Sequence, residues 1–244
     1  MTFDLRIIAS AATLAGAAST GVYYASYAVR SQLFGATNWH GRTDTEAVAL
    51  TFDDGPSADT EHALDVLVDY DVRATFFMIG CRVKQHPQTA RRVVREGHEI
   101  GNHSYSHPIY LFRTPRETKR QLALTQEIIT EVTGVRPRRA RPPCGVRTPA
   151  YFAATRELGL CTVQWDVAGF DWKRRNAREI AHDVLRTARA GSIILLHDGD
   201  SEGKKDRRET VAALPLIIEG LIARGLRIAP LAELLGSKRE EAMI

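Results

Sequence analysis

The chain has few cysteines for its length. Among its 244 residues are three, Cys81, Cys144 and Cys161, which is an odd number without the close spacing of a metal-binding pair. We therefore expect no disulfide framework, because a chain of this length can bury a large apolar core instead. Internal repeats and low-complexity runs are also lacking. What remains is an ordinary globular composition, with 44% hydrophobic and 25% charged residues.

The sequence also lacks any motif typical of nucleic-acid binding, although it is mildly basic. Its formal net charge is +4 and its pI is about 9.1. This charge suits an anionic surface such as a membrane or cell wall and would also suit nucleic acid, but we favour a basic surface that is simply exposed to solvent. The basic charge is the single feature that would favour a nucleic-acid partner. Because no sequence motif supports it, we expect no nucleic-acid partner.

Charged residues are absent from positions 7–29, between Arg6 and Arg30. This stretch is long enough to span a bilayer, but it is rich in Ala, Ser and Thr and only mildly apolar. Three interpretations stay open: an uncleaved anchor, a secretory signal cleaved near Ala15-Gly16-Ala17, or a helix packed on the domain. We expect residues 1–34 to be a membrane anchor or signal segment. The protein would then be membrane-anchored or secreted, in the cell envelope.

Short apolar runs alternate with amphipathic stretches of helix length after residue 46. We expect a linker at 35–46, one α/β domain at 47–236 and a polar tail at 237–244. The expected strands are 47–52, 74–79, 98–102, 139–141, 161–166, 192–196 and 226–228, and the expected helices are 58–70, 86–96, 115–133, 148–158, 176–190, 208–224 and a last one from about 230. This alternation predicts parallel strands with crossover helices. Seven such units indicate a closed or nearly closed barrel.

Two short sequence motifs contain the candidate catalytic and metal-binding residues. The string Thr51–Pro56 ends an apolar run with the adjacent carboxylates of Asp53 and Asp54. Further along, His103 and His107 are four residues apart, which places them on one face of a helical turn where they can share a metal ion. One carboxylate completes three ligands, and the other is free to act as a base on water. The pattern indicates metal-assisted hydrolysis, although Asp-Asp-Gly-Pro is also typical of a β-turn.

The two strings together resemble the first two motifs of the polysaccharide deacetylases, carbohydrate esterase family 4, also called the NodB-homology domain. The resemblance extends from about Ala47 to Leu235. It implies an irregular seven-stranded (β/α) barrel whose chemistry gathers at the C-terminal ends of the strands. It also implies that Asp54, His103 and His107 hold one divalent metal ion, most naturally zinc, with cobalt, nickel or manganese as alternatives. Asp53 is then the general base.

A third segment, Arg141–Gly145, resembles the third motif of the family. The resemblance implies that Arg141 pairs with Asp53 and fixes its orientation. It places Pro143 and Cys144 at the substrate, with the backbone N–H of Cys144 in an oxyanion hole. Members of the family commonly carry an aromatic residue where this chain has Cys144, so we expect one wall of the sugar site to differ from the family pattern.

Further arginines lie close to this third segment, at positions 136, 138, 139 and 147. We interpret them as a basic rim exposed to solvent. The alternative is a contact surface for an acidic glycan or a lipid phosphate.

The fourth and fifth motifs are matched less evenly. Residues 168–172 resemble Asp-Ser-x-Asp-Trp, with Ala168 and Gly169 in place of the first two residues. The resemblance implies that Asp171 orients a histidine and raises its pKa, and that Trp172 forms an apolar wall. Residues 195–198, Leu-Leu-His-Asp, resemble the fifth motif, which implies that His197 is the general acid. It also implies that Leu195 lines a pocket for the acetyl methyl group.

These observations predict a metal-dependent deacetylase with a single catalytic domain at 47–236. Its substrate would be a glycan of the N-acetylglucosamine type, hydrolysed to a free amine and acetate. One alternative is a hydrolase of the same fold that acts on a non-sugar amide. Another is a glycan-binding protein without activity, because Cys144 and Ala168 depart from the family pattern.

Overall fold

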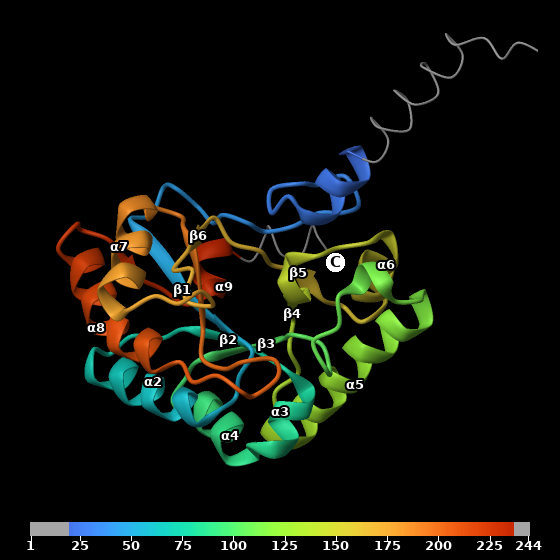
Figure 1. The fold of residues 1–244 in the computed structure, drawn as a ribbon, viewed down its shortest axis with the longest axis horizontal. Helices are drawn as coiled ribbons and strands as arrows, with labels where there is room; N and C mark the ends of the chain where they lie inside the picture. The colour runs from blue at the N-terminus through green and yellow to red at the C-terminus, as the bar shows by residue number, and fades with distance from the viewer. Residues whose placement is uncertain (1–19, 237–244) are drawn as a thin grey trace, which may run out of the picture.

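A strongly curved parallel sheet forms the centre of the molecule. The structure is a computed structural model that describes residues 20–236, and Figure 1 shows the helices in an arc around the strands. The strands are β1 (Ala47–Asp53), β2 (Thr75–Met78), β3 (Glu99–Asn102), β4 (Arg139–Ala140), β5 (Cys161–Thr162), β6 (Val167–Ala168), β7 (Ile193–His197) and β8 (Arg227–Ile228). They pair in the order β5-β4-β3-β2-β1-β7-β6, and β8 pairs with the start of β1. Every pairing is parallel, so the carboxyl ends of the strands meet at one side of the sheet.

The predicted α/β fold, an irregular (β/α) barrel, is confirmed, but of the strand expected at 161–166 only the start is formed, as β5, and a strand that was not expected, β6, follows at Val167–Ala168. β5 and β6 stand at the two ends of the strand order, and among residues 20–236 no pairing joins them. Between them the backbone pairs with residue 38 instead. The N–H of Asn38 donates to the Thr162 oxygen at 2.9 Å, and the N–H of Gln164 donates to the Asn38 oxygen at 2.8 Å. The segment 35–46, expected as a linker, thus lies against the opening of the barrel.

Crossover helices connect the strands on the outside of the sheet. They are α2 (Ala58–Asp69), α3 (Gly80–Gln85), α4 (Pro87–Arg95), α5 (Pro115–Thr133), α6 (Pro149–Glu157), α7 (Ala177–Thr187) and α8 (Arg208–Ile222). The last helix, α9 (Leu231–Leu235), follows β8 and packs in a separate apolar cluster with Ala47 and Ala49 of β1. Side chains of Ser57, Thr114, Thr148 and Asn176 accept N–H bonds at the first turns of α2, α5, α6 and α7. Such caps satisfy backbone donors that have no partner inside the helix.

The central strand β1 is buried along its whole length. On one face, Leu50 and Phe52 pack with Phe76 of β2 into a cluster that includes residues of α2, α7 and α8. Burial of this apolar surface fixes the register of the strands. The carboxyl end of β1 is therefore held in the middle of the barrel mouth, between β2 and β7.

The N-terminal end of the described chain packs against the barrel through a buried arginine. Residues 20–27 are helical, and Arg147 donates to the carbonyl oxygens of Ala25, Ala28 and Val29 just beyond and within that helix. The interpretation of Arg147 as part of a solvent-exposed rim is wrong, because its side chain is completely buried under this helix. Arg139 is also buried and pairs with Glu99 at 2.9 Å.

The predicted membrane segment at 7–29 lies only partly within the structure. Residues 1–19 and the polar tail at 237–244 are outside the described residues. Within residues 20–236, no helix is both long enough and apolar enough to cross a bilayer. Three tyrosines of the helical segment, Tyr23, Tyr24 and Tyr27, are exposed.

Candidate active site

The two adjacent aspartates have different surroundings at the end of β1. Asp53 is the last residue of the strand, and its Oδ1 accepts a hydrogen bond from Nη1 of Arg141 at 2.8 Å. Asp54 follows with φ of 76°, in the left-handed region, and its Oδ1 lies 3.2 Å from Nε2 of His107. Aspartate tolerates this backbone conformation better than most residues. The turn therefore sends the two carboxylates in different directions.

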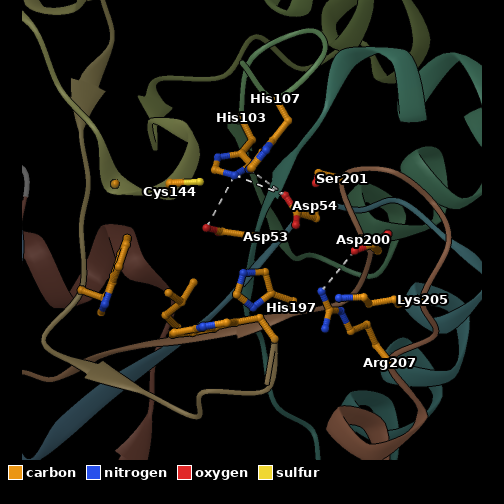
Figure 2. Close-up of a pocket in the computed structure, with 14 residues that line it drawn as sticks. Asp53, Asp54, His103, His107, Cys144, His197, Asp200, Ser201, Lys205 and Arg207 are labelled. Carbon is orange, nitrogen blue, oxygen red and sulfur yellow. Dashed lines mark ion pairs between the residues drawn. The ribbon is translucent and has the colours of Figure 1, made fainter. Parts of the chain in front are cut away.

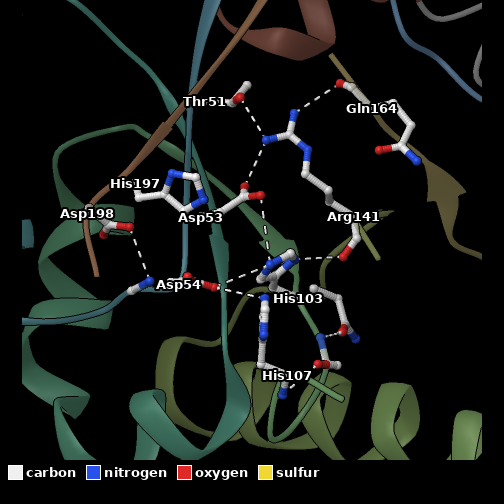
Figure 3. Close-up of polar contacts among 12 residues, drawn as sticks. Thr51, Asp53, Asp54, His103, His107, Arg141, Gln164, His197 and Asp198 are labelled. Atoms are coloured by element: carbon white, nitrogen blue, oxygen red, sulfur yellow. Dashed lines mark hydrogen bonds and ion pairs between the residues drawn. The ribbon is translucent and has the colours of Figure 1, made fainter. Parts of the chain in front are cut away.

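Asp54, His103 and His107 converge on one point (Figure 3). One ligand atom from each lies within 4.8 Å of the other two, and Nε2 of His103 is 3.5 Å from Oδ1 of Asp54. Nδ1 of His103 lies 2.7 Å from the carbonyl oxygen of Arg141, so Nδ1 carries the proton and Nε2 presents its lone pair to the cluster. Oδ1 of Asp54 is buried and has no hydrogen-bond partner. A divalent cation would satisfy this orphaned oxygen, so the residues fit a metal ion.

The two histidines reach this point from a loop, and the expectation of a helical turn is wrong. Ser104 and His107 have φ of 66° and 55°, which no α-helix allows. Side chains replace the missing helical hydrogen bonds. Oδ1 of Asn102 accepts the Ser104 N–H at 3.0 Å, and Oε1 of Gln121 on α5 accepts the next two backbone N–H groups at 3.0 and 2.9 Å. The loop is therefore shaped by a residue distant in sequence.

Arg141 is completely buried and supports Asp53. Besides Asp53, its guanidinium donates to Oγ1 of Thr51 at 2.8 Å and to the carbonyl oxygen of Gln164 at 3.1 Å. Its planar group also lies over the ring of Phe77, 4.2 Å from the centroid. Burial lowers the pKa of Arg141, and the charge of Asp53 opposes this effect. The contacts hold the arginine in position, and the arginine in turn orients the carboxylate.

His197 faces the same space from the end of β7. Its Nδ1 lies 2.8 Å from Oδ1 of Asp171, and Oδ2 of Asp171 accepts the His197 backbone N–H at 2.7 Å. Burial by itself would lower the pKa of His197. The charge and the hydrogen bond of Asp171 outweigh burial, and the pKa is raised from its usual value of 6.5 to about 9. His197 is therefore a proton donor at neutral pH, with Nε2 free to give the proton.

Three residues that sequence reasoning did not single out hold this acid in place. Oγ1 of Thr210 donates to Oδ2 of Asp171 at 2.9 Å, and Nη1 of Arg207 donates to the Asp171 carbonyl oxygen at 3.0 Å. Asp198 joins β7 to the turn after β1, because its Oδ1 accepts the Gly55 N–H at 3.1 Å. Only Asp198 carried a sequence signal, as the neighbour of the histidine in the fifth motif.

A cavity of about 440 Å³ lies over these groups. Figure 2 shows Asp53 beside the cluster of His103, His107 and Asp54, with its Oδ2 3.8 Å from Nε2 of His103, and His197 on the far side of Asp53. Cys144, Trp172 and Leu195 contribute to its wall, as expected from their positions in the sequence. Pro143 is buried and is not among the lining residues; it begins the tight turn that places Cys144 at φ of 54°.

The loop between β7 and α8 adds a further part of the wall that the sequence did not indicate. Its contributions to the cavity are Asp200, Ser201, Lys205 and Arg207, all labelled in Figure 2. Arg207 closes this loop, because its Nε donates to the carbonyl oxygen of Gly199 at 2.6 Å.

A base and an acid face one cavity, next to three side chains that can bind a metal ion. These are the groups that a metal-dependent hydrolase uses. Comparison with known proteins gives the family. The family model described as polysaccharide deacetylase matches residues 40–163. A chitooligosaccharide deacetylase of Bradyrhizobium sp. (strain ANU 289) is 38% identical over 206 residues, which cover 81% of this chain and 94% of the relative.

Two further comparisons agree. A peptidoglycan-N-acetylglucosamine deacetylase of Bacillus cereus is 37% identical over 207 residues, covering 84% of this chain and 95% of the relative. The crystal structure of the Bc1960 peptidoglycan N-acetylglucosamine deacetylase superposes with a TM-score of 0.76 at 35% identity, covering 82% of this chain and 92% of that one. The chain belongs to the polysaccharide deacetylase family, and it is a carbohydrate N-deacetylase, a hydrolase of carbon–nitrogen bonds.

Proposed function

We propose that the protein is a metal-dependent deacetylase that converts N-acetylglucosamine units of a glycan to the free amine, with release of acetate. One observation carries this proposal. Asp53, fixed by Arg141, and His197, fixed by Asp171, face the same cavity as the cluster of three metal-ligand side chains. A base and an acid held apart can serve the two proton transfers that amide hydrolysis needs.

The cluster of Asp54, His103 and His107 would hold the metal ion. Two imidazoles and one carboxylate suit zinc best, and they also accept cobalt, nickel or manganese. When bound, the ion would polarise the acetyl carbonyl and make water a stronger nucleophile. Among residues 20–236 this is the group of His, Cys, Asp and Glu side chains that could hold such an ion.

The remaining steps belong to the protein's own groups. Asp53 accepts a proton from the attacking water as the new carbon–oxygen bond forms, and Arg141 keeps its carboxylate aimed at that water. The backbone N–H of Cys144 donates to the oxygen that gains charge. His197 protonates the sugar nitrogen as the carbon–nitrogen bond breaks, which releases an amine. Leu195 lines the space for the acetyl methyl group, and its apolar surface excludes water there.

An acetate-release screen across N-acetylated glycans tests this proposal. The protein is stripped of metal with a chelator, then restored with zinc, cobalt, nickel or manganese, and acetate is measured with oligomers of N-acetylglucosamine. We expect activity in the restored protein and little in the stripped protein. Activity on small non-sugar amides alone would support the hydrolase of a non-sugar amide. Glycan binding by restored protein without any acetate would support the non-catalytic alternative.

We also propose that the protein works in the cell envelope, brought there by residues 7–29. Support comes from the absence of charge in this stretch and from Tyr23, Tyr24 and Tyr27, which are exposed and of a type enriched at membrane interfaces. Intact mass and cell fractionation of the full chain test this. An uncleaved chain in washed membranes indicates an anchor, and a chain shortened near Ala17 indicates a signal. An uncleaved chain that needs no detergent to stay in solution contradicts both.

A further inference from the structure

The helix at residues 20–27 presents large side chains to solvent. Tyr23 and Tyr27 are 65% and 37% exposed, and their rings stack with centroids 4.9 Å apart. Val22 and Tyr24 are 53% and 51% exposed. A helix on a globular domain normally turns its large apolar side chains toward the core. This helix instead has an uncovered face.

A second exposed apolar segment follows the loop of the two metal-site histidines. It contains the short 3-10 helix η1 (Tyr110–Phe112). Tyr110 is buried, whereas Leu111 and Phe112 are 40% and 72% exposed, and Ile109 just before them is 37% exposed. Single exposed apolar residues are normal, but several in one turn indicate a contact surface.

The two segments adjoin across the loop between β4 and α6. The ring of Tyr110 packs against the ring of Tyr151 in α6, with centroids 5.3 Å apart. The guanidinium of Arg147, in the loop, donates to the backbone of the helix. Burial lowers the pKa of Arg147, and the nearby hydroxyl groups of Tyr151 and Tyr24 oppose this effect. One buried arginine therefore connects the helix to the surroundings of η1.

Both segments lie on the catalytic side of the barrel. η1 belongs to the loop after the carboxyl end of β3, and the helix packs on the loop after β4, where Cys144 lines the catalytic cavity. Figure 1 shows the helix, in blue, on the side of the molecule that carries β5 and α6. We call residues 20–27 and 109–116 together the apolar face. A surface that covers the apolar face lies beside the mouth of the catalytic cavity.

The charge around the apolar face is positive. Arg113 and Arg116 are exposed, and neither forms an ion pair within the part of the chain that the structure describes. The next carboxylate along the chain, that of Glu117, pairs with Arg120 at 2.8 Å. Two stretches of sequence that include the apolar face contain no aspartate or glutamate, 5–43 and 100–116. Unpaired cations beside exposed apolar side chains are typical of surfaces that bind anionic lipid.

An uncharged stretch of sequence leads into the apolar face. Residues 7–19, which precede the helix, contain no charged side chain. As an anchor, this stretch would hold the helix at the surface of a bilayer. As a signal cleaved near Ala17, it would leave the helix on the mature chain. The apolar face is therefore present in both forms of the protein.

We propose that the apolar face docks on an anionic lipid bilayer and holds the mouth of the catalytic cavity close to the lipid surface. Leu111 and Phe112 enter the headgroup region, where the two neighbouring arginines meet lipid phosphates. The tyrosines of the helix lie at the boundary between lipid and water. The inference deepens the proposed location in the cell envelope and depends on it, but it depends on no step of the proposed chemistry. It brings glycan units held near a membrane within reach of the active site.

Quenching by lipid tests the contact at η1. Full-chain Phe112→Trp is bound to vesicles of phosphatidylcholine and phosphatidylglycerol in equal parts, collected by flotation, and measured with and without brominated acyl chains. We expect the introduced indole to be quenched after the fluorescence of the parent is subtracted. The matched control is Val68→Trp, because Val68 is 55% exposed near the end of α2 and so lies at the opposite end of the barrel. Equal quenching of the two variants overturns the proposal.

Removal of charge tests whether the partner is anionic. In the Phe112→Trp protein, Arg113→Gln with Arg116→Gln should raise the fraction of phosphatidylglycerol that half-maximal quenching requires. Each arginine near an anionic surface contributes about fivefold to binding, so the pair contributes about 25-fold. The matched control is Arg136→Gln with Arg138→Gln, which removes the same charge from two exposed arginines before β4. An equal requirement for phosphatidylglycerol in the two double variants contradicts the proposal.

The outcomes distinguish this inference from the proposals made above. A full chain that does not bind vesicles at all counts against the location in the cell envelope as well. A chain that binds vesicles without selective quenching at residue 112 contradicts the docking alone. Acetate release is not measured, so failure of the proposed chemistry would leave these results unchanged. If Phe112→Trp fluorescence responds to N-acetylglucosamine oligomers and not to vesicles, the apolar face binds glycan and the proposal is wrong.

Discussion

Asp171 contacts His197 through both of its carboxylate oxygens, one at the imidazole Nδ1 and the other at the backbone N–H, at 2.8 and 2.7 Å. A single side chain thus sets both the charge and the orientation of the ring. Because Asp171 is itself held by Thr210 and Arg207, the imidazole cannot turn without breaking several hydrogen bonds. This arrangement makes His197 an acid with a fixed direction.

Asp171→Asn should move the alkaline limb of the pH profile of kcat to lower pH. In the parent protein the pKa of His197 is about 9, so the acid stays protonated up to that pH. Without the carboxylate, burial lowers the pKa, and the protonated fraction falls at neutral pH. The measurement is kcat from pH 6 to 10, with Thr210→Val as a control that keeps the carboxylate. An unchanged alkaline limb would contradict the assignment of His197 as the acid.

Asp54→Ala and Asp53→Asn should separate metal binding from turnover. Loss of Asp54 should lower metal affinity by at least about a hundredfold, since even residues that support ligands are worth about 10- to 100-fold. Asp53→Asn should keep the metal and lower kcat by about a hundredfold to ten-thousandfold. Metal content after dialysis and acetate release are measured on both variants. Retained activity in Asp53→Asn would overturn its role as the base.

Gln121→Ala should weaken metal binding although residue 121 contacts no metal. Its Oε1 accepts the two backbone N–H groups that follow Ser104, and these hold His103 and His107 in position. We expect metal affinity to fall by about tenfold or more and the free energy of unfolding to fall by about 1–3 kcal/mol. Gln121→Glu keeps the acceptor oxygen, but its second oxygen would face Oε1 of Glu117, which now accepts from Gln121 Nε2 at 3.0 Å, so the matched control is Gln121→Glu combined with Glu117→Gln. Metal affinity equal to that of the parent in Gln121→Ala would show that the loop is held by other contacts.

Asp198 should make the metal-stripped protein less stable as the pH rises. Burial, only partly offset by a hydrogen bond from Thr60, raises the pKa of Asp198 to about 7 in the folded protein, well above the value of 3.8 for a free side chain. The folded state therefore favours the protonated form, and stability from this group is lost between about pH 4 and 7. Asp198→Asn removes this dependence. Tm measured from pH 4 to 8 should fall less steeply in the variant than in the parent.

The Asp198 prediction has a direct control. Ser57→Ala leaves the carboxyl in place and removes a neighbouring hydroxyl that contacts only the Asp198 carbonyl oxygen and the first turn of α2. Its Tm should be lower at every pH but should keep the slope of the parent. Parallel curves for Asp198→Asn and the parent would show that the carboxyl does not titrate in this range.

The sequence predicted the features that depend on local pattern. The apolar run of β1 and the two aspartates after it placed the carboxylates correctly, because strand burial and strand end are both visible in neighbouring residues. The long helix at 115–133 was predicted to the residue, since an apolar stripe, Pro115 and Gly134 mark its face and its two ends.

The features that were missed depend on distant parts of the chain. The loop that carries His103 and His107 takes its shape from Gln121, which no local pattern connects to it. The split between β5 and β6 depends on Asn38, more than a hundred positions earlier in the chain. Nothing in the neighbouring sequence distinguishes Arg147 from an exposed arginine, because the helix that buries it is formed by residues 20–27.

The opening between β5 and β6 has a practical consequence for anyone who excises the enzyme. A start at residue 47 would look natural from the repeat of strand and helix, yet it would discard Asn38 and with it the backbone partners of Thr162 and Gln164. It would also remove the helix that covers Arg147, and with it the carbonyl oxygens of Ala25, Ala28 and Val29 to which this guanidinium donates. A shortened enzyme that starts no later than residue 20 keeps both sets of contacts.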